Sequence, residues 1–442
     1  MTTGFEARPS LAMRAVPYLP LGLFAAMGAI LAYLIRMPCR SGGWVDQVKI
    51  YTNFCYTDIY PLYFDRQLGT QNPYFAVVPV DKQVEYPVVL GEVMQFVAWI
   101  ARWLHPGEEH IGEQAVAFYD ITVMLLGICL VIGVLLMAAV AGPTRRWDAL
   151  WFAISPAVVF AAYINWDLVA GALSMGVLLA WSRQRQVLAG VLLGLAIATK
   201  FYPLMFVGAL FLLTWRTGKW RPFLVTLAST VGAWLVVNVP FMLLAWEGWR
   251  RFYVFSQERG IDWGSPWLFF MKKGWPILGD TDVSLLGMIS LAVLLLGVAL
   301  VTLAAPQRPR LAQICFLALA AFMMTNKVWS PQFVLWLVPF AVLARPNWKP
   351  LALWQAAEVW YFMAIWLYLL AQSPVDRPDL GIGDDTYFTA VWGRIITIAI
   401  MMAFVVRDIL RPEHDVVRQG GIDDQIGGVF DEAPDRFTLR PA

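Results

Sequence analysis

Long apolar runs, separated by short polar connections, occupy this chain from about residue 16 to residue 406. A bilayer core about 30 Å thick takes about 20 helical residues to cross, and a segment alone in lipid satisfies its own backbone hydrogen bonds only as a helix. The pattern therefore predicts an all-α polytopic membrane protein. The apolar runs lie at 16–35, 88–104, 116–141, 148–163, 168–181, 187–199, 201–215, 222–245, 283–305, 311–325, 332–343, 350–371 and 389–406.

Composition excludes the main alternative classes. Hydrophobic residues make up 59% of the 442 residues and charged residues only 14%, which leaves too little polar surface for a soluble globular protein. The net charge is only +2, and the Lys and Arg residues are spread among the loop ends, so nothing indicates binding to nucleic acid. The 22 Trp residues fit a protein with many anchors at the membrane interface.

The connections between the runs are of two kinds, and the two kinds alternate. By the positive-inside rule the basic connections are cytoplasmic, so the polar connections face the outside of the plasma membrane. The basic connections contain Arg145 and Arg146, Arg183 and Arg185, residues 216–221, Arg308 and Arg310, residues 345–349, and Arg407 and Arg411. The polar connections contain Asp58, Asn165 and Asp167, Thr199 and Lys200, Arg259, and Asn326 and Lys327.

The run 88–104 decides how many times the chain crosses the membrane. If it spanned the bilayer, the basic connections after it would lie outside the cell. As an interfacial or re-entrant helix it leaves all of them in the cytoplasm, which predicts about twelve spans with both termini inside.

This topology divides the chain into three parts. We expect a cytoplasmic N-terminus at 1–15, a transmembrane domain at 16–406 and a cytoplasmic tail at 407–442. The first outward loop, at 36–115, is long and contains the interfacial helix. The first apolar run is long enough to span, so we expect a retained helix rather than a cleaved signal peptide. The glycines of the tail, from about Pro412, favour a loosely ordered segment.

Several runs are shorter than a bilayer core requires, and their outward ends carry polar residues. Irregular backbone at membrane depth is tolerated only where it is buried in protein or lines a cavity. We therefore expect the tips at 165–167, 199–200 and 326–332 to lie below the outer surface and to wall a wet groove that opens outward. The short runs are 148–163, 168–181, 187–199, 201–215, 311–325 and 332–343.

Charged side chains at that depth are costly and indicate a function. Asp167 either binds a ligand or caps the helix that follows it. Lys200 either extends to the lipid headgroups or binds a ligand anion, and the anion is favoured because the outward side otherwise avoids Lys. Lys327 stands beside Trp329 and Gln332, an arrangement that fits an anionic ligand such as phosphate.

Asp58 is the best candidate for a catalytic base. It lies among aromatic residues of the first outward loop, between Tyr56 and Tyr60, where partial desolvation would raise its pKa and make it a better base. Asp46, Asp65 and Glu85 are rival carboxylates of the same loop. The alternative is that all four are solvated loop acids.

The four cysteines show no metal-binding spacing. Cys39 and Cys55 lie in the first outward loop, where either a disulfide or two free thiols fit the oxidising environment. The other two lie within apolar runs and indicate packing. His105 and His110 have no third ligand at a suitable spacing, so we expect no metal.

Several of these motifs resemble glycosyltransferase family 87. The first loop carries Asp58 followed by Tyr63, Arg66 and Glu85, and the tips carry Asn165 to Asp167, Lys200 with Pro203, and Lys327 with Ser330, Pro331, Gln332 and Trp336. The resemblance covers roughly residues 16–406. It implies the GT-C fold and an inverting transfer with an aspartate base, which corresponds to Asp58. Here Asp46 lies between the first helix and Asp58, which leaves the base open between the two.

The resemblance also implies the substrates. The family includes actinobacterial mannosyltransferases that use polyprenyl-phosphate mannose, so we expect a lipid-phosphate sugar donor, with mannose first and arabinofuranose second, and a glycolipid or glycan acceptor outside the cell, without a cofactor. Lys327, Lys200 and Arg259 would neutralise the leaving phosphate. Other expected substrate-binding residues are Gln332, Asn165, Asp167, Glu85, Tyr63 and Arg66. The alternative is a transporter or flippase for a lipid-linked sugar, but the internal repeats common in transporters are not evident.

Overall fold

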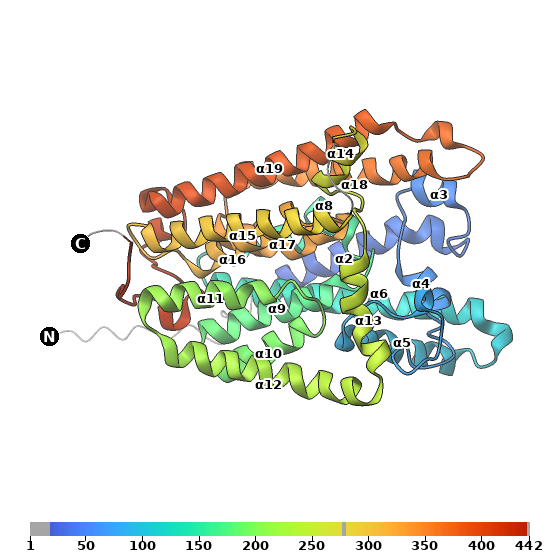
Figure 1. Cartoon of the computed structure of the whole chain (residues 1–442), viewed down its shortest axis with the longest axis horizontal. Coiled ribbons are helices and arrows are strands. Elements are labelled where there is room, and N and C mark those ends of the chain that lie inside the picture. Colours follow the sequence, from blue (N-terminus) through green and yellow to red (C-terminus); the bar gives the residue numbers. More distant parts are fainter. Residues whose placement is uncertain (1–17, 276–279, 440–442) are drawn as a thin grey trace.

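A computed structural model describes residues 18–275 and 280–439. Within these ranges every regular element is a helix, which confirms the prediction of an all-α protein. Figure 1 shows most helices running side by side along the long axis of the molecule. The predicted N-terminal segment at 1–15 lies outside the described residues.

Six helices of the described chain are long and apolar enough to cross a membrane. α12 and α15 expose a row of apolar side chains, among them Val236, Leu243 and Val293, to the outside of the bundle. Such surfaces fit contact with lipid. The six are α2 (Tyr18–Arg40), α6 (Ile111–Ala141), α12 (Trp220–Leu244), α15 (Asp280–Ala304), α18 (Trp348–Gln372) and α19 (Asp384–Leu410).

Five further apolar helices within the described residues are shorter, which confirms that the chain contains helices too short for a full bilayer. α16 and α17 bury nearly every side chain and form the centre of the bundle, as expected for helices that are apolar all round. The total number of crossings stays a prediction. The five are α9 (Asp167–Ser182), α10 (Gln186–Ile197), α11 (Leu204–Thr217), α16 (Leu311–Thr325) and α17 (Val334–Ala344).

The predicted run 148–163 is not one helix. It is divided into η3 (Arg146–Ala149), α7 (Leu150–Ile154) and α8 (Pro156–Ala161). Proline has no N–H to donate and disfavours a helical conformation in the residue before it. Ser155 is accordingly extended, with φ −62° and ψ 141°, and the helix restarts at Pro156.

The segment between α2 and α6 folds into short helices at one end of the bundle, opposite the C-terminal end of α19 (Figure 1). Cys39 and Cys55 form a disulfide with a Cα–Cα distance of 6.0 Å, which resolves the alternative left open by the sequence. This bond ties the end of α2 to the connection between α3 and α4. The short helices are α3 (Gln47–Thr52), α4 (Ile59–Asp65), η1 (Val80–Lys82), α5 (Val88–Leu104) and η2 (Glu108–His110).

α5 is amphipathic, which fits the prediction of a helix that does not span. It buries Met94 and Val97 and exposes Trp99 and Trp103. It does not qualify as a candidate span among the described helices. Its position relative to a bilayer stays a prediction.

The connection from α12 to α15 contains α13 (Trp246–Glu258) and α14 (Pro266–Lys272). α13 carries Arg250 and Arg251 together with exposed Trp246. Helices with a charged face and an aromatic face commonly lie in the membrane interface.

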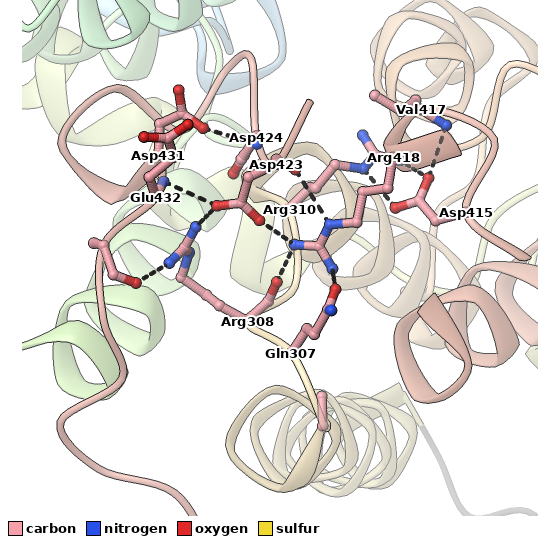
Figure 2. A network of polar contacts seen from close by, with 12 residues as sticks. Gln307, Arg308, Arg310, Asp415, Val417, Arg418, Asp423, Asp424, Asp431 and Glu432 are labelled. Atoms are coloured by element: carbon pink, nitrogen blue, oxygen red, sulfur yellow. Dashed lines mark hydrogen bonds and ion pairs between the residues drawn. The ribbon is translucent and has the colours of Figure 1, made fainter. Parts of the chain in front are cut away.

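The tail after α19 is not loosely ordered, contrary to the expectation from its glycines. It returns along the ends of α16 and α17 and forms η6 (Pro412–His414), η7 (Arg418–Gly420) and η8 (Gly428–Phe430). Figure 2 shows its acidic residues meeting the basic residues before α16. Arg310 binds Asp415 at 2.7 Å, with both side chains buried, and Asp424 accepts a hydrogen bond of 2.8 Å from the Leu311 N–H.

One tail glycine is required by close packing. Gly428 has a φ of +60°, and a Cβ at this position would lie 2.3 Å from the Trp181 carbonyl oxygen. The Trp181 indole donates a hydrogen bond of 2.8 Å to the Gly427 carbonyl, and its ring packs against Phe430. The tail is therefore part of the folded bundle.

Candidate active site

A cavity of about 1140 Å³ lies where the tips of the short helices meet the segment between α2 and α6. The turn before α9, the turn before α11 and the tip between α16 and α17 all reach it. α13, the loop after α13 and the C-terminal half of α18 complete the wall. The polar tips, which are far apart in the sequence, therefore share one site.

Asp58 lies in the wall of this cavity and is held by its backbone. Its N–H donates a hydrogen bond of 2.7 Å to the Ile164 carbonyl, and the Thr57 hydroxyl donates one of 2.8 Å to the Tyr163 carbonyl. Asp58 precedes α4 but does not cap it with its side chain. The carboxylate instead accepts a hydrogen bond of 2.7 Å from the Tyr56 hydroxyl.

The surroundings of Asp58 give its carboxyl a higher pKa than that of a solvent-exposed aspartate. Burial raises the pKa of this carboxyl to about 6, although the Tyr56 hydrogen bond and the charges of Lys200 and Arg259 limit the rise. A carboxyl with a pKa of about 6 is largely ionised at neutral pH and binds a proton more tightly than an ordinary aspartate. This environment fits the expectation of a general base at Asp58.

The rival carboxylates have other partners. Asp46 lies outside the cavity wall and caps α3 by accepting a hydrogen bond of 3.0 Å from the Lys49 N–H. Asp65 faces Lys82 at 3.7 Å. Local contacts therefore account for the positions of the Asp46 and Asp65 carboxylates.

Glu85 reaches the cavity wall but is already paired. Arg66 donates two hydrogen bonds of 2.7 Å to its carboxylate and a third, of 2.8 Å, to the Asp81 carbonyl. Asp262, another carboxylate of the wall, pairs with Arg259. Within the described chain, Asp58 is thus the cavity carboxylate without a basic partner at ion-pair distance.

Lys200 and Asp167 form an ion pair of 2.9 Å, with the Asp167 side chain fully buried. The Lys200 ammonium also lies 4.9 Å from the centre of the Tyr86 ring. Asp167 occupies the first turn of α9 and does not line the cavity, whereas Asn165 and Lys200 do. The pair joins the start of α9 to the turn before α11, so the Lys200 charge is already balanced within the protein.

Lys327 and Arg259 supply positive charge at the α13 side of the cavity. The Lys327 ammonium donates hydrogen bonds to the Gln257 carbonyl, at 2.9 Å, and to the Ser284 hydroxyl, at 3.2 Å. These contacts hold the Lys327 ammonium at the cavity wall.

The loop after α13 is attached to the 326–332 tip by main-chain contacts. The Asp262 N–H donates a hydrogen bond of 2.9 Å to the Lys327 carbonyl, and the Ser265 hydroxyl donates one of 3.2 Å to the Asn326 carbonyl. This docking places Arg259 and Lys327 on the same cavity. Gln332, two residues before α17, also lines it and is largely buried.

A buried charged pair, Arg394 and Glu358, contacts the 326–332 tip. Arg394 of α19 donates a hydrogen bond of 3.0 Å to the Trp329 carbonyl, and its guanidinium lies 4.2 Å from the centre of the Trp329 ring. Glu358 of α18 lies 3.4 Å from Arg394. Neither residue of this pair was predicted from the sequence, although charged residues inside two apolar runs are themselves an informative signal.

The remaining expected site residues lie outside the cavity wall. The Tyr63 hydroxyl donates a hydrogen bond of 2.8 Å to Gln114, and Arg66 reaches the cavity only through Glu85. Two aromatic residues of the wall, Tyr51 and Trp366, were not anticipated. The high aromatic content of the chain gave no basis for choosing them.

Comparison with known families identifies the family of this chain. The sequence model of the family described as glycosyltransferase family 87 matches residues 96–326, just over half of the chain. The chain belongs to glycosyltransferase family 87. No curated protein matches it.

Membership of family 87 makes this protein a membrane glycosyltransferase. The matched region includes Asn165, Lys200 and Arg259 but ends before Lys327 and does not reach back to Asp58. The case for Asp58 and Lys327 therefore depends on their positions in the cavity.

Proposed function

We propose that the protein transfers a sugar from a polyprenyl-phosphate donor to a glycolipid or glycan acceptor, with inversion at the anomeric carbon and with Asp58 as general base. One observation carries this proposal. Asp58, which has no basic partner at ion-pair distance within the described chain, lines the same cavity as the basic side chains of Lys327 and Arg259.

The chemistry requires a base on one side of the sugar and an anion site on the other. As the acceptor hydroxyl oxygen attacks the anomeric carbon, its proton passes to the Asp58 carboxylate. The bond between the anomeric carbon and the phosphate oxygen breaks, and its electron pair leaves with the polyprenyl phosphate. Attack opposite to the leaving group inverts the configuration.

The leaving phosphate would lie at the α13 side of the cavity. Lys327 and Arg259 stabilise the charge that develops on its oxygen, since preformed positive groups cost no reorganisation during the reaction. Lys200 pairs with Asp167 and Arg259 pairs with Asp262, so each of these two brings less net positive charge to the site than an unpaired cation would. Glu85, held by Arg66, positions the loop that carries Tyr86 rather than accepting a proton.

The catalytic side is proposed to face outward across the plasma membrane. At the end of the bundle away from the cavity, basic connections contact the tail through Arg308 and Arg310 and the C-terminal end of α19 through Arg345. The positive-inside rule assigns that end to the cytoplasm. No nucleotide is required on the outer face, since the donor is lipid-linked.

The test is sugar transfer by purified protein in nanodiscs. Donors with a labelled mannose or arabinofuranose on a polyprenyl phosphate are offered with a synthetic glycoside acceptor. Equal amounts of labelled glycoside and free polyprenyl phosphate would support the proposal. Movement of the donor between the leaflets of vesicles, without release of polyprenyl phosphate, would instead support a flippase.

A further inference from the structure

Three aromatic rings lie nearly parallel beside Asp58. Tyr56 and Trp366 stack with their centres 4.2 Å apart, and Tyr51 lies 6.4 Å from Tyr56 and 6.3 Å from Trp366. The three planes agree within 20°. All three side chains line the cavity, and we call them the aromatic wall.

The aromatic wall is held rigidly. Tyr51 lies on α3 within the loop closed by the Cys39–Cys55 disulfide, and Tyr56 directly follows Cys55, just before α4. α3 packs against α18, which carries Trp366. The Tyr56 hydroxyl is fixed by its bond to Asp58. A ring bound on this wall would therefore meet the carboxylate in a defined position.

The wall also contains a hydrogen-bond donor that the protein does not use. The Trp366 side chain is only 3% exposed, and its indole N–H has no acceptor among the described residues. A buried polar group without a partner is costly, and a ligand hydroxyl would satisfy it. An apolar ligand would leave this N–H without an acceptor.

The two sides of the cavity differ in chemistry. The side toward α13 has Arg259, Lys327 and Phe255, which suits a phosphate attached to a hydrocarbon chain. On the second side, the described lining residues of α3 and α18 are Tyr51, Ile365, Trp366 and Leu369, and none of them is basic. Asp58 lies beside this second side.

We propose that the aromatic wall is the acceptor subsite and that the acceptor is a carbohydrate whose ring stacks on Tyr51 and Tyr56. One face of a pyranose presents C–H groups with a slight positive charge, which complement the negative face of an aromatic ring. Its hydroxyls then reach Asp58, and a small shift of the wall would bring one of them to the Trp366 indole N–H, which is itself buried. This inference rests on the proposed function and names the class of its acceptor.

The test measures binding rather than transfer. The probe is n-octyl α-D-mannopyranoside, titrated calorimetrically into the protein in nanodiscs below its micelle concentration. 1-O-octylglycerol, which has the same tail and no ring, corrects for partition into lipid. Wild-type protein should bind the mannoside and not the glycerol ether.

Matched variants distinguish the ring face from the hydroxyl of Tyr51. Tyr51→Phe keeps the face and should bind like wild type, whereas Tyr51→Leu should bind about 2- to 10-fold more weakly, the range expected for loss of one ring contact. Phe96→Leu, on the exposed face of α5 away from this cavity, serves as the control. Unchanged affinity in Tyr51→Leu, or an equal loss in Tyr51→Phe, would overturn the inference.

A second measurement uses only wild-type protein, in case Tyr51→Leu does not fold. In hydrogen–deuterium exchange the mannoside should protect residues 47–58, and protection only within 252–259 would contradict the proposal. Failure of the proposed function has a different signature. The mannoside would then bind in a Tyr51-dependent way while no donor is consumed.

Discussion

The Tyr56 hydroxyl donates a hydrogen bond of 2.7 Å to Asp58, the carboxylate that our proposal makes the catalytic base. The bond stabilises the ionised form of Asp58 and therefore lowers a pKa that burial alone would raise further. It also orients the carboxylate toward the cavity. Tyr56 thus links the aromatic wall to the chemistry.

Activity should fall on acidification with an apparent pKa of about 6. The base acts only when ionised, and burial raises the pKa of Asp58 to about 6, so the fraction of active enzyme is high at pH 7 and decreases below pH 6. One pH unit below that pKa, about a tenth of the carboxyls remain ionised. The measurement is kcat/KM for transfer between pH 4.5 and 8. A fall in kcat/KM with an apparent pKa near 4 would indicate an ordinary solvated carboxylate.

Tyr56→Phe should shift the acidic limb of the kcat/KM profile to higher pH. The variant keeps the aromatic ring but loses the hydrogen bond that stabilises the carboxylate, so the pKa of Asp58 rises further. The activity at pH 7 falls in consequence and recovers toward pH 8. An unshifted limb would show that Asp58 does not control the pH profile.

Lys327→Ala should weaken use of the donor. A charge-assisted contact to phosphate is worth about 1.5 to 3 kcal/mol, which corresponds to roughly 10- to 100-fold in the donor KM. Lys273→Ala provides the control, because Lys273 is an exposed lysine that pairs with Asp385 outside the cavity. An unchanged donor KM in Lys327→Ala would place the phosphate elsewhere.

Lys200→Ala should lower stability more than it changes donor binding. The substitution leaves the buried Asp167 carboxylate without its ion-pair partner, which typically costs about 3 to 5 kcal/mol. The double variant Lys200→Met, Asp167→Leu should recover much of the lost stability. Thermal unfolding in detergent checks both. A stable Lys200→Ala protein with a raised donor KM would instead make Lys200 a phosphate ligand.

Arg310→Ala should destabilise the bundle while leaving the site intact. Arg310 binds Asp415 and also donates a hydrogen bond of 2.9 Å to the Leu343 carbonyl, so its loss releases the tail and the end of α17 together (Figure 2). Breaking such a buried pair typically costs about 3 to 5 kcal/mol. Lys349→Ala, at the start of α18, is a milder control. The folded fraction of Arg310→Ala should keep the wild-type KM for the donor.

The main features of the fold were accessible from the sequence because they depend on local pattern. Apolar length identified the helices, and the polar tips indicated which connections share a site. The break before Pro156 was equally local, but the apolar content of the run outweighed the proline in our prediction. Patterns of this kind need no knowledge of distant partners.

What the sequence did not reveal depends on contacts between distant residues. Nothing local indicates that Lys200 would pair with Asp167, or that Arg394 would reach Trp329. The tail was misjudged for the same reason. Its glycines were interpreted as a sign of flexibility, whereas Gly428 is required by the close approach of Trp181.

The most direct test of the account is sugar transfer by Asp58→Asn. The amide keeps the size of the side chain but cannot accept the proton, so the rate should fall by about 10²- to 10⁴-fold. Donor binding and thermal stability should remain near wild type, since Lys327 and Arg259 hold the phosphate. Asp46→Asn, which alters only the cap of α3, should retain most of the activity. Near-normal turnover in Asp58→Asn, measured beside a folded but inactive Asp46→Asn, would contradict the assignment of Asp58 as the base.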